Sequence, residues 1–293
     1  MVFDRVRNDA YARAIAKVVS PGCRVLDLGA GLGIHGLMAA AAGAGEVILL
    51  EPSQVIGMST DVVAINGFKD RVTVLRKRAE EAEIEPAVDV IISVFTGNFL
   101  LTEDLLPSLF LARDRFLKPG GRLLPSGAEM KVALTQAPSF YAERVACWSE
   151  ESQNLDFSPI RKYAANTVHY LKADQVEVHL LTTPALLLNL DFYTATSANC
   201  HCHAKLIAET SGVCHGVLGW FDMQLGDESF STGPDAEPSH WSQAFLPLDP
   251  PLQVSAGQVI DFELDRPEFG EWTWALTHEG KRQRHSTFNS EPA

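Results

Sequence analysis

Two acidic residues and a run of glycines have the types and spacing that suit recognition of a nucleoside ligand. Asp27 ends an apolar stretch and precedes glycines at 29, 31 and 33, and Glu51 ends a second apolar stretch 24 residues after Asp27. An acid at about this distance beyond a glycine turn is typical of a carboxylate that binds ribose hydroxyls. Glycines let a ligand approach the backbone, and the free amides of a helix N-terminus point at it. We therefore expect Asp27, Gly29, Gly31 and Glu51 to bind a nucleoside.

The glycine pattern alone fits two different cofactors. Residues 31–36, Gly-Leu-Gly-Ile-His-Gly, match the dinucleotide pattern G-x-G-x-x-G. In dinucleotide folds the first glycine closes the strand, whereas here Asp27 and Gly29 precede the match. A carboxylate at the strand tip would repel a pyrophosphate, but it can interact with a cationic or hydroxyl-bearing ligand. This favours S-adenosylmethionine, which has an ammonium, a sulfonium and a ribose but no phosphate. We do not expect a nicotinamide nucleotide to bind.

Strands and helices alternate through the first 125 residues, and these elements must position the acids and glycines. Such alternation is typical of an α/β, doubly wound, Rossmann-like parallel sheet, whose ligands bind at the carboxyl ends of the strands. We expect this S-adenosylmethionine-binding domain to span residues 1–125. The predicted strands are 24–27, 46–51, 72–75, 88–94 and 122–124, and the predicted helices are 4–19, the stretch from the glycine turn to about 42, 53–65 and 102–117.

After Pro125 the apolar pattern changes to a period near two. Segments such as 129–136, 176–181, 201–209 and 212–225 alternate apolar and polar residues and are separated by turns. This pattern predicts an antiparallel, β-barrel-like domain over residues 126–293. Residues 149–171 read as a helical or irregular insertion into that domain.

Composition limits the class of protein. A chain of 293 residues with 46% apolar residues can bury one large or two medium cores, which favours two domains. The net charge of −13 disfavours binding to nucleic acid or to an anionic membrane and is compatible with a cationic acceptor. No apolar run reaches membrane-spanning length, and the first residues lack the apolar core of a signal peptide. Five cysteines without a framework spacing fit a reducing compartment, so we expect a cytoplasmic protein.

A cluster of soft ligands, residues 200–203 (Cys-His-Cys-His) with Cys214 and His215, suggests a zinc or copper site. On a strand, however, successive residues face opposite sides. If the chain turns near residues 210–212, Cys214 pairs with about Ile207, on the order of 23 Å from Cys200. We therefore expect no metal. The basic run 281–285 follows a hairpin signal and predicts an exposed edge strand.

Taken together, these stretches resemble the protein arginine methyltransferase family over nearly the whole chain. The matching segments are residues 1–7, 25–33 (VLDLGAGLG), 48–53 (ILLEPS), 78–83 (RAEEAE), 89–106, 112–121 and 239–241 (Ser-His-Trp). The resemblance implies binding of S-adenosylmethionine. The cofactor-binding residues that it implies are Arg7 on the carboxylate, Gly29 and Gly31 near the methionine moiety, Glu51 on the ribose and Glu80 on the adenine amine.

The resemblance also implies an acceptor site. The family's loop carries two glutamates nine residues apart, which clamp the guanidinium group of the substrate. Here Glu103 occupies the second position, but Val94 occupies the first, and Phe95 and Asn98 stand where the family has Trp and Tyr. The catalytic residues that the resemblance implies are Glu103, His240 and Asp4, and the implied pocket residues are Val94, Phe95, Asn98 and Trp241. The insertion at 149–171 stands where the family carries a dimerisation arm, which implies a homodimer.

The departure at Val94 bears on the methyl acceptor. A buried guanidinium that faces one carboxylate and one isopropyl group leaves donors unpaired, at a cost of about 1–3 kcal/mol for each group. We therefore expect an N-methyltransferase that acts on a small molecule or a peptide side chain. Three alternatives remain: arginine methylation in an altered pocket, O-methylation, and a catalytically silent partner subunit that binds the cofactor. The family's cofactor-covering helix would precede Met1, so another element closes the site or the sequence is part of a longer one.

Overall fold

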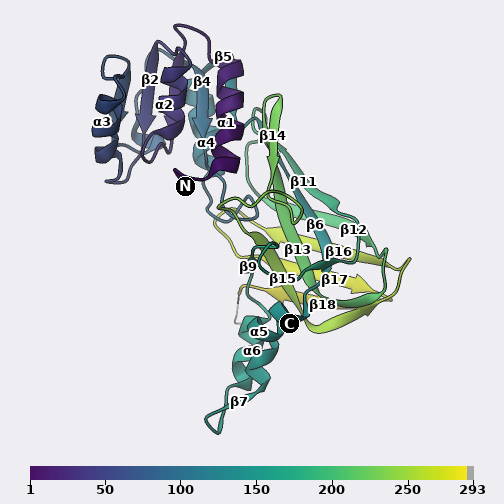
Figure 1. Ribbon diagram of the computed structural model, residues 1–293. Coiled ribbons are helices and arrows are strands. Elements are labelled where there is room, and N and C mark those ends of the chain that lie inside the picture. The colour runs from purple at the N-terminus through teal and green to yellow at the C-terminus, as the bar shows by residue number, and fades with distance from the viewer. Residues whose placement is uncertain (289–293) are drawn as a thin grey trace.

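The computed structural model describes residues 1–288 (Figure 1). It has three parts: a parallel sheet flanked by helices, a larger antiparallel part, and a narrow arm that projects away from both. In the described part of the chain, no helix combines the length and apolar composition that a membrane crossing would require.

The parallel sheet has the strand order β3-β2-β1-β4-β5. Its central strands are buried on both faces, which explains why the sequence reads there as continuous apolar runs. The chain leaves β1 for β2 on one side and later adds β4 on the other side, so the switch point lies between β1 and β4. The doubly wound sheet predicted from the sequence is confirmed. Its elements are α1 Arg5–Val18, β1 Arg24–Leu28, α2 Ile34–Ala41, β2 Glu46–Leu50, α3 Ile56–Ile65, β3 Val72–Leu75, η1 Ala79–Glu81, β4 Val88–Ser93, α4 Leu106–Phe116 and β5 Leu117–Leu124.

Helix α4 begins later than its predicted start at residue 102. Phe99, Leu100 and Asp104 have φ angles of 49°, 63° and 53°, a left-handed region that a right-handed helix of L-residues does not include. The helix starts at Leu106, with a proline in its first turn, where a missing amide hydrogen costs nothing. Residues 94–105 are therefore an irregular loop at the carboxyl end of β4.

The antiparallel part consists of two sheets. Inward and outward residues alternate along their strands, and aromatic side chains such as Phe245, Phe262 and Trp274 are fully buried. The first sheet comprises β6 Gly127–Gln136, β9 His169–Leu171, β10 His179–Leu180, β11 Ala185–Asp191, β13 Gly212–Leu225, β14 Glu228–Ser231 and β15 Gln243–Val254. The second comprises β12 Cys200–Ile207, β16 Val259–Arg266, β17 Thr273–His278 and β18 Lys281–Ser286. Among residues 1–288, β18 pairs with β17 alone, as expected for an edge strand.

The predicted hairpin between β12 and β13 is wrong. Strand β12 pairs with β16, whereas β13 lies between β6 and β15, so the two strands belong to different sheets. Cys214 accordingly pairs with Leu252 and not with Ile207. A short connection between two alternating strands has the same sequence pattern whether the strands pair or pass between sheets, because each strand buries one face in both cases.

The insertion forms the arm seen in Figure 1. It contains short helical and strand segments: α5 Pro138–Arg144, η2 Ala146–Ser149, β7 Glu151–Ser152, β8 Leu155–Asp156, η3 Ser158–Ile160 and α6 Arg161–Ala164. At its base Arg161 Nη2 lies 2.7 Å from Asp249 Oδ1, and the hydroxyl of Tyr141 donates to the same oxygen at 2.9 Å. A helical insertion is confirmed, but its bounds differ from the predicted residues 149–171, because it begins with α5 at Pro138 and because His169–Leu171 form β9, which pairs with β15 in the first sheet. The insertion joins the antiparallel part through this polar cluster.

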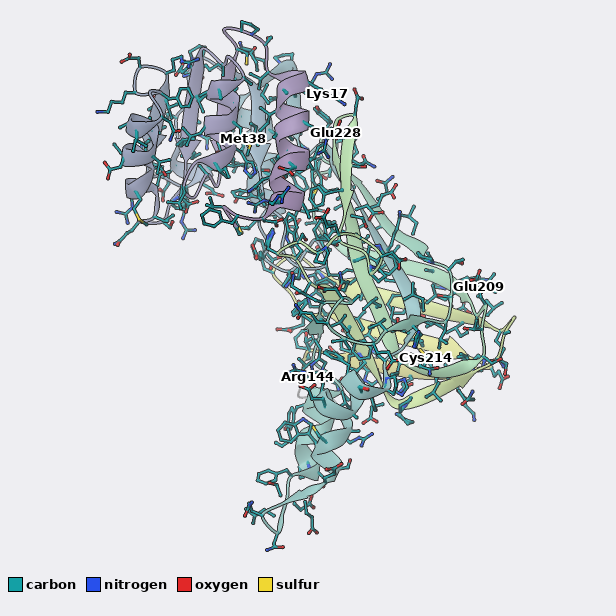
Figure 2. All side chains as sticks on the ribbon, in the orientation of Figure 1. Lys17, Met38, Arg144, Glu209, Cys214 and Glu228 are labelled. Carbon is teal, nitrogen blue, oxygen red and sulfur yellow. The ribbon has the colours of Figure 1, made fainter. Side chains whose placement is uncertain are left out.

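Helix α1 joins the two larger parts. Near its C-terminal end, Arg13 Nε and Lys17 Nζ lie 2.8 and 2.6 Å from the Glu228 carboxylate on β14 (Figure 2). Arg13 and Lys17 are exposed, so solvent screens both ion pairs and each contributes little to stability. The opposite end of α1 lies beside the glycine turn that follows β1.

Candidate functional site

The glycine turn after β1 has a backbone conformation that favours glycine. Gly29 and Gly31 have φ angles of 71° and 53°, which residues with a Cβ atom adopt only at an energetic cost. The amide of Gly29 donates to the carbonyl of Leu50 at 2.8 Å, which fixes the turn against the end of β2. The turn therefore lies at the carboxyl ends of the strands, where the sequence predicts a ligand site.

Asp27 lies beneath this turn. Its carboxylate accepts a hydrogen bond from the amide of Gly36 at 2.7 Å, and the residue is 2% exposed. Burial raises the pKa of the Asp27 carboxyl to about 7, and the bond from Gly36 opposes that rise. Asp27 supports the first turn of α2 and is not among the residues that line the adjoining cavities, so its direct contact with a cofactor stays a prediction.

Two adjoining cavities lie over the turn. The first measures about 320 Å³ and is lined by Arg7, Gly29, Gly31, His35, Glu51, Val94, Phe95 and Glu103, among others. The second measures about 250 Å³ and is lined by residues that include Gly29, Arg78, Glu80, Phe95 and Ser108. A Cβ atom on Gly29 would lie 2.1 Å from Phe95 Cε1, so the aromatic ring rests on the glycine between the two cavities.

Arg7 is buried at the wall of the first cavity, with 1% exposure. Its Nη2 donates to the carbonyl of Met1 at 2.6 Å and its Nε donates to Asn8 Oδ1 at 3.1 Å. Nη1 has no hydrogen-bond partner among residues 1–288. Burial lowers the pKa of the Arg7 guanidinium, although the group remains charged. A buried guanidinium nitrogen without a partner beside a cavity suits an anionic group, such as the carboxylate of a ligand.

Glu51 lines the first cavity and Glu80 lines the second. Glu51 accepts hydrogen bonds from the amides of Gly31 and Ser53, at 3.3 and 2.9 Å. Glu80 accepts from the hydroxyl of Ser108 at 2.8 Å. A hydrogen bond from its own backbone amide and the Ser108 bond lower the pKa of Glu80, so this exposed carboxyl is ionised at neutral pH. Each acid lines one of the two cavities, and the contacts of Glu51 with a ribose and of Glu80 with an adenine stay predictions.

The loop after β4 forms the acceptor side of the first cavity. Val94, Phe95 and Glu103 line it together. Glu103 is exposed at the rim, and partial desolvation raises the pKa of its carboxyl. A carboxyl with a raised pKa can accept a proton more readily than a fully solvated one. Val94 presents an isopropyl group to the same cavity, so the carboxylate and the apolar wall are parts of one pocket.

Asp4 and His240 form a pair at the N-terminus of α1, and neither residue lines the two cavities beside the glycine turn. Asp4 Oδ2 lies 2.6 Å from His240 Nδ1 and accepts from the His240 amide at 3.1 Å. Burial raises the pKa of Asp4, but the hydrogen bonds from His240 and Arg7 outweigh this, and the pKa falls. An exposed ion pair would raise the pKa of the histidine, yet burial outweighs the carboxylate and lowers the pKa of His240. The imidazole is therefore neutral at pH 7 and donates from Nδ1, which leaves Nε2 as an acceptor.

Asn98 and Trp241 brace the loops of the site. Asn98 Oδ1 accepts from the amide of Ser242 at 2.9 Å, and the indole of Trp241 donates to the carbonyl of Thr96 at 2.9 Å. Trp241 is 3% exposed, and neither residue lines the two cavities beside the glycine turn. Their contacts hold the His240 segment against the loop after β4, and a contact with an acceptor stays a prediction.

Comparison with known proteins identifies the family. Residues 126–268 match the model of the arginine methyltransferase oligomerization subdomain. The chain is 35% identical over 272 residues to protein arginine N-methyltransferase 1.1 of Arabidopsis thaliana, covering 89% of this chain and 68% of that protein. It is 34% identical to protein arginine N-methyltransferase 6 of Xenopus laevis, covering 87% of this chain and 78% of that protein. The chain belongs to the protein arginine methyltransferase family.

Solved structures of this family have the same fold. A chain of the Trypanosoma brucei PRMT1 enzyme–prozyme heterotetrameric complex with AdoHcy matches with a TM-score of 0.87 and 27% identity, covering 98% of this chain and 96% of that chain. Protein arginine methyltransferase 10 of Arabidopsis thaliana, in an open conformation, matches with a TM-score of 0.84 and 25% identity at the same coverages. The predicted resemblance is confirmed.

As a protein arginine methyltransferase family member, the chain takes S-adenosylmethionine as its cofactor. The residues present fit this group. The unpartnered Arg7 Nη1 can meet the carboxylate of the methionine moiety, Glu51 can accept from ribose hydroxyls, and Glu80 can accept from the adenine amine. These individual contacts stay predictions.

Three residues that shape the site were not predicted from the sequence, namely His35, Arg266 and Lys172. His35 Nε2 is buried without a partner among the described residues and lines the first cavity. His35 lies within the glycine stretch that predicts a ligand site, so its position in the sequence could have identified it as a residue of that site. Arg266 forms a two-fold ion pair with Asp104, next to Glu103, and Lys172 contacts the His240 segment. Neither of these two residues belongs to a recognisable motif.

The cysteine and histidine cluster divides between two faces of β12. Cys200 is buried and its Sγ lies 3.0 Å from Cys202 Sγ, whereas His201 and His203 are exposed and pair with acids on β16. This alternation is confirmed. Within residues 1–288, no group of three or more His, Cys, Asp or Glu side chains has the arrangement of a metal site.

Proposed function

We propose that the protein is an S-adenosylmethionine-dependent N-methyltransferase that methylates a nitrogen atom of a small molecule or a peptide side chain. The observation that carries this proposal is the pairing of Glu103 with Val94 in one wall of the first cavity. A single carboxylate beside an apolar surface suits a cationic nitrogen that has few hydrogens to donate. It leaves a guanidinium group, which has five N–H donors, with unpaired hydrogens.

In this proposal the chain supplies position, desolvation and a proton acceptor. When bound, the sulfonium of the cofactor supplies an activated methyl group. Arg7 holds the carboxylate of the cofactor, Glu51 its ribose and Glu80 its adenine. Gly29 and Gly31 let the cofactor approach the backbone. Glu103 anchors the acceptor and accepts the proton that its nitrogen loses. Neutral His240, oriented by Asp4, offers Nε2 as a second acceptor of that proton.

The proposal extends to domains, assembly and location. Residues 1–125 bind the cofactor, residues 126–293 present the acceptor, and the arm at 149–171 joins two copies in a homodimer. The arm exposes apolar side chains whose burial in a partner would be favourable, namely Leu155, Phe157, Ile160 and Tyr163. Five free cysteines support a reducing, cytoplasmic location.

Replacement of Glu103 by Gln tests the catalytic assignment. We expect E103Q to bind S-adenosylmethionine with unchanged affinity in calorimetry, because Glu103 belongs to the acceptor side. Turnover should fall by about 100-fold or more, since general-base catalysis typically supplies such a factor. The control is E83Q, at an exposed acid on the loop after η1. Unchanged turnover in E103Q would remove Glu103 from catalysis.

A panel of acceptors tests the substrate class. Formation of S-adenosylhomocysteine is followed with an arginine peptide, a histidine peptide, primary and secondary amines, and hydroxyl compounds. The proposal expects the highest kcat/KM with an amine or imidazole. A preference for the arginine peptide would instead support arginine methylation in an altered pocket, and a preference for a hydroxyl compound would support O-methylation.

The role of partner subunit is a second candidate. It is favoured by Val94 in place of a carboxylate and by the likeness to an enzyme–prozyme complex. A protein with that role binds the cofactor but releases no S-adenosylhomocysteine with any acceptor in the panel. Turnover by the purified chain alone would exclude it.

A further inference from the structure

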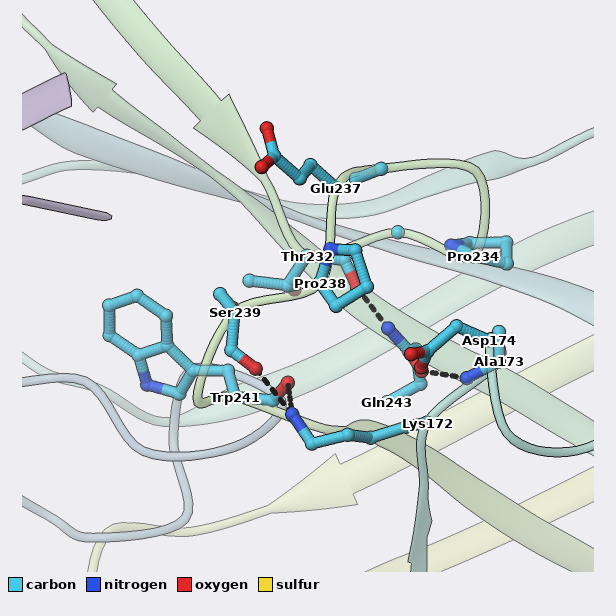
Figure 3. A pocket seen from close by; sticks show the side chains of 12 residues that line it. Lys172, Ala173, Asp174, Thr232, Pro234, Glu237, Pro238, Ser239, Trp241 and Gln243 are labelled. Carbon is cyan, nitrogen blue, oxygen red and sulfur yellow. Dashed lines mark hydrogen bonds between the residues drawn. The ribbon is translucent and has the colours of Figure 1, made fainter. Parts of the chain in front are cut away.

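Lys172 is the first residue after β9, the strand by which the chain returns from the arm. Its ammonium group donates to the carbonyl of Ser239 and, at 3.3 Å, to the carbonyl of Trp241 (Figure 3). These two carbonyls flank His240 on either side. Lys172 therefore binds the backbone at the residue before His240 and at the residue after it.

One peptide unit links Lys172 to Asp4. The carbonyl of Ser239 accepts from the Lys172 ammonium, and the amide of His240, in the same peptide unit, donates to Asp4 Oδ2 at 3.1 Å. The peptide dipole thus lies between a cation and an anion. Hydrogen bonds in such a chain polarise and strengthen one another, and bonds to charged groups are about twice as strong as neutral ones.

The neighbouring contacts make this arrangement rigid. Residue Leu171 of β9 pairs with Gln243 of β15, and the Gln243 side chain accepts from the amide of Ala173 at 2.9 Å. The same side chain donates to the carbonyl of Thr232 at 2.6 Å. Both ends of the segment between β14 and β15 are thereby attached to the end of β9. A small cavity of about 20 Å³, lined by Lys172, Ser239 and Trp241 among others, lies beside these contacts.

We propose that Lys172 is a positioning residue, which orients His240 toward the acceptor by holding the backbone on both sides of it. This inference rests on the proposed role of the Asp4–His240 pair. It extends that role to a residue outside both cavities beside the glycine turn, on the strand that connects the site to the arm. Removal of the cation weakens the bond between the His240 amide and Asp4, so the backbone that carries the imidazole can shift. The separate bond between His240 Nδ1 and Asp4 Oδ2 still keeps the carboxylate beside the ring.

The positive charge of Lys172 should lower the pKa of His240. The charged groups that face His240 are Asp4, Arg7 and the α-amino group of Met1. Lys172 adds positive charge through the Ser239–His240 peptide unit, and a nearby cation disfavours protonation of an imidazole. The pKa of His240 should therefore rise when Lys172 becomes neutral. A residue that merely fastens the segment would change stability without this shift.

The experiment compares K172M, K172Q and K172R in the full chain. The His240 ring is titrated by NMR, with H240N used to assign its signal, and affinity for S-adenosylmethionine and thermal unfolding are measured in parallel. We expect K172M and K172Q to raise the pKa of His240, to reduce kcat about tenfold and to leave cofactor affinity unchanged. A tenfold change corresponds to the loss of one charge-assisted bond. K172R should restore both the titration and the rate.

The two neutral variants separate charge from hydrogen bonding, because glutamine still donates to a carbonyl and methionine does not. An unchanged His240 titration in both K172M and K172Q, with activity that falls only in proportion to folded protein, would overturn the inference. The titration requires no turnover. If the wild-type chain methylates nothing, the proposed function fails, yet the shift of the His240 titration still tests the role of Lys172.

Discussion

Asp27 is a buried carboxyl whose protonation is coupled to folding. Burial raises its pKa from an ordinary value near 4 to about 7. Between these values the folded chain holds a proton that the unfolded chain has released, so the folded state is favoured at low pH. The stability that this group contributes is fully present below about pH 4 and is lost as the pH rises through about 7.

Substitution of Asp27 by Asn should remove this pH dependence. Asparagine keeps an oxygen that accepts from the Gly36 amide but cannot ionise. We expect the unfolding temperature of D27N, relative to wild type, to be several degrees higher at about pH 8 than at about pH 5. The measurement is thermal unfolding across this range, with D61N, at an exposed acid, as the control. A constant difference between D27N and wild type across the range would contradict the assignment.

At the scale of single residues, the sequence identified side chains that act within a motif. The pair of Asp4 and His240, 236 positions apart, could be predicted from the sequence, because each residue lies in a segment with a family counterpart. The role of Lys172 could not be predicted from the sequence, because Lys172 binds two backbone carbonyls and every residue type has a backbone carbonyl. No pattern of side chains can reveal a contact of this kind before the backbone path is known.

At the scale of elements, the loop after β4 is held by an ion pair with β16. Arg266 is 3% exposed, and its Nη1 and Nη2 lie 2.5 and 2.6 Å from the two oxygens of Asp104. The amide of Phe269 donates to the same carboxylate at 2.9 Å. Because Asp104 has a left-handed backbone and follows Glu103 directly, these bonds fix the direction in which Glu103 leaves the chain.

Replacement of Asp104 by Asn should therefore destabilise the protein. It would leave the buried Arg266 without its counter-ion, at a cost of about 3 kcal/mol. By contrast, K17M removes one exposed ion pair to Glu228, where Arg13 remains, and should destabilise the protein far less than D104N, because solvent screens the pair. Denaturant unfolding of both variants gives the comparison. Equal losses in D104N and K17M would show that Arg266 finds another partner.

Helices, strands and turns were predicted correctly where the local sequence determines the structure. The parallel strands follow from apolar runs, and the glycine turn follows from positions that tolerate positive φ. The predicted start of helix α4 is too early, because the apolar spacing typical of a helix continues through residues 102–105. There, contacts with β16 impose a non-helical backbone conformation. The sheet assignment of β12 failed for a related reason, since strand pairing depends on partners distant in sequence.

At the scale of the whole molecule, the arm is the part that is least buried. Leu155 and Phe157 at its tip are 58% and 40% exposed. If the arm joins two copies, L155D with F157D places two charges in an apolar interface and should convert the dimer to a monomer. Light scattering after size-exclusion chromatography measures the change. The matched control is I207D, because Ile207 is 54% exposed on β12, away from the arm. A dimer that persists in the arm variant would assign the interface elsewhere.

The unpartnered nitrogen of Arg7 has a consequence for the lifetime of the chain. Arg7 is buried beside the first cavity, and this site for an anionic group exists only in the folded chain. A ligand whose carboxylate binds Nη1 therefore draws the population, by mass action, away from unfolded and partly opened forms. Proteases act on those forms. The abundance of this protein in a cell should therefore follow the supply of methyl donor, which would make the enzyme scarce where its cofactor is scarce.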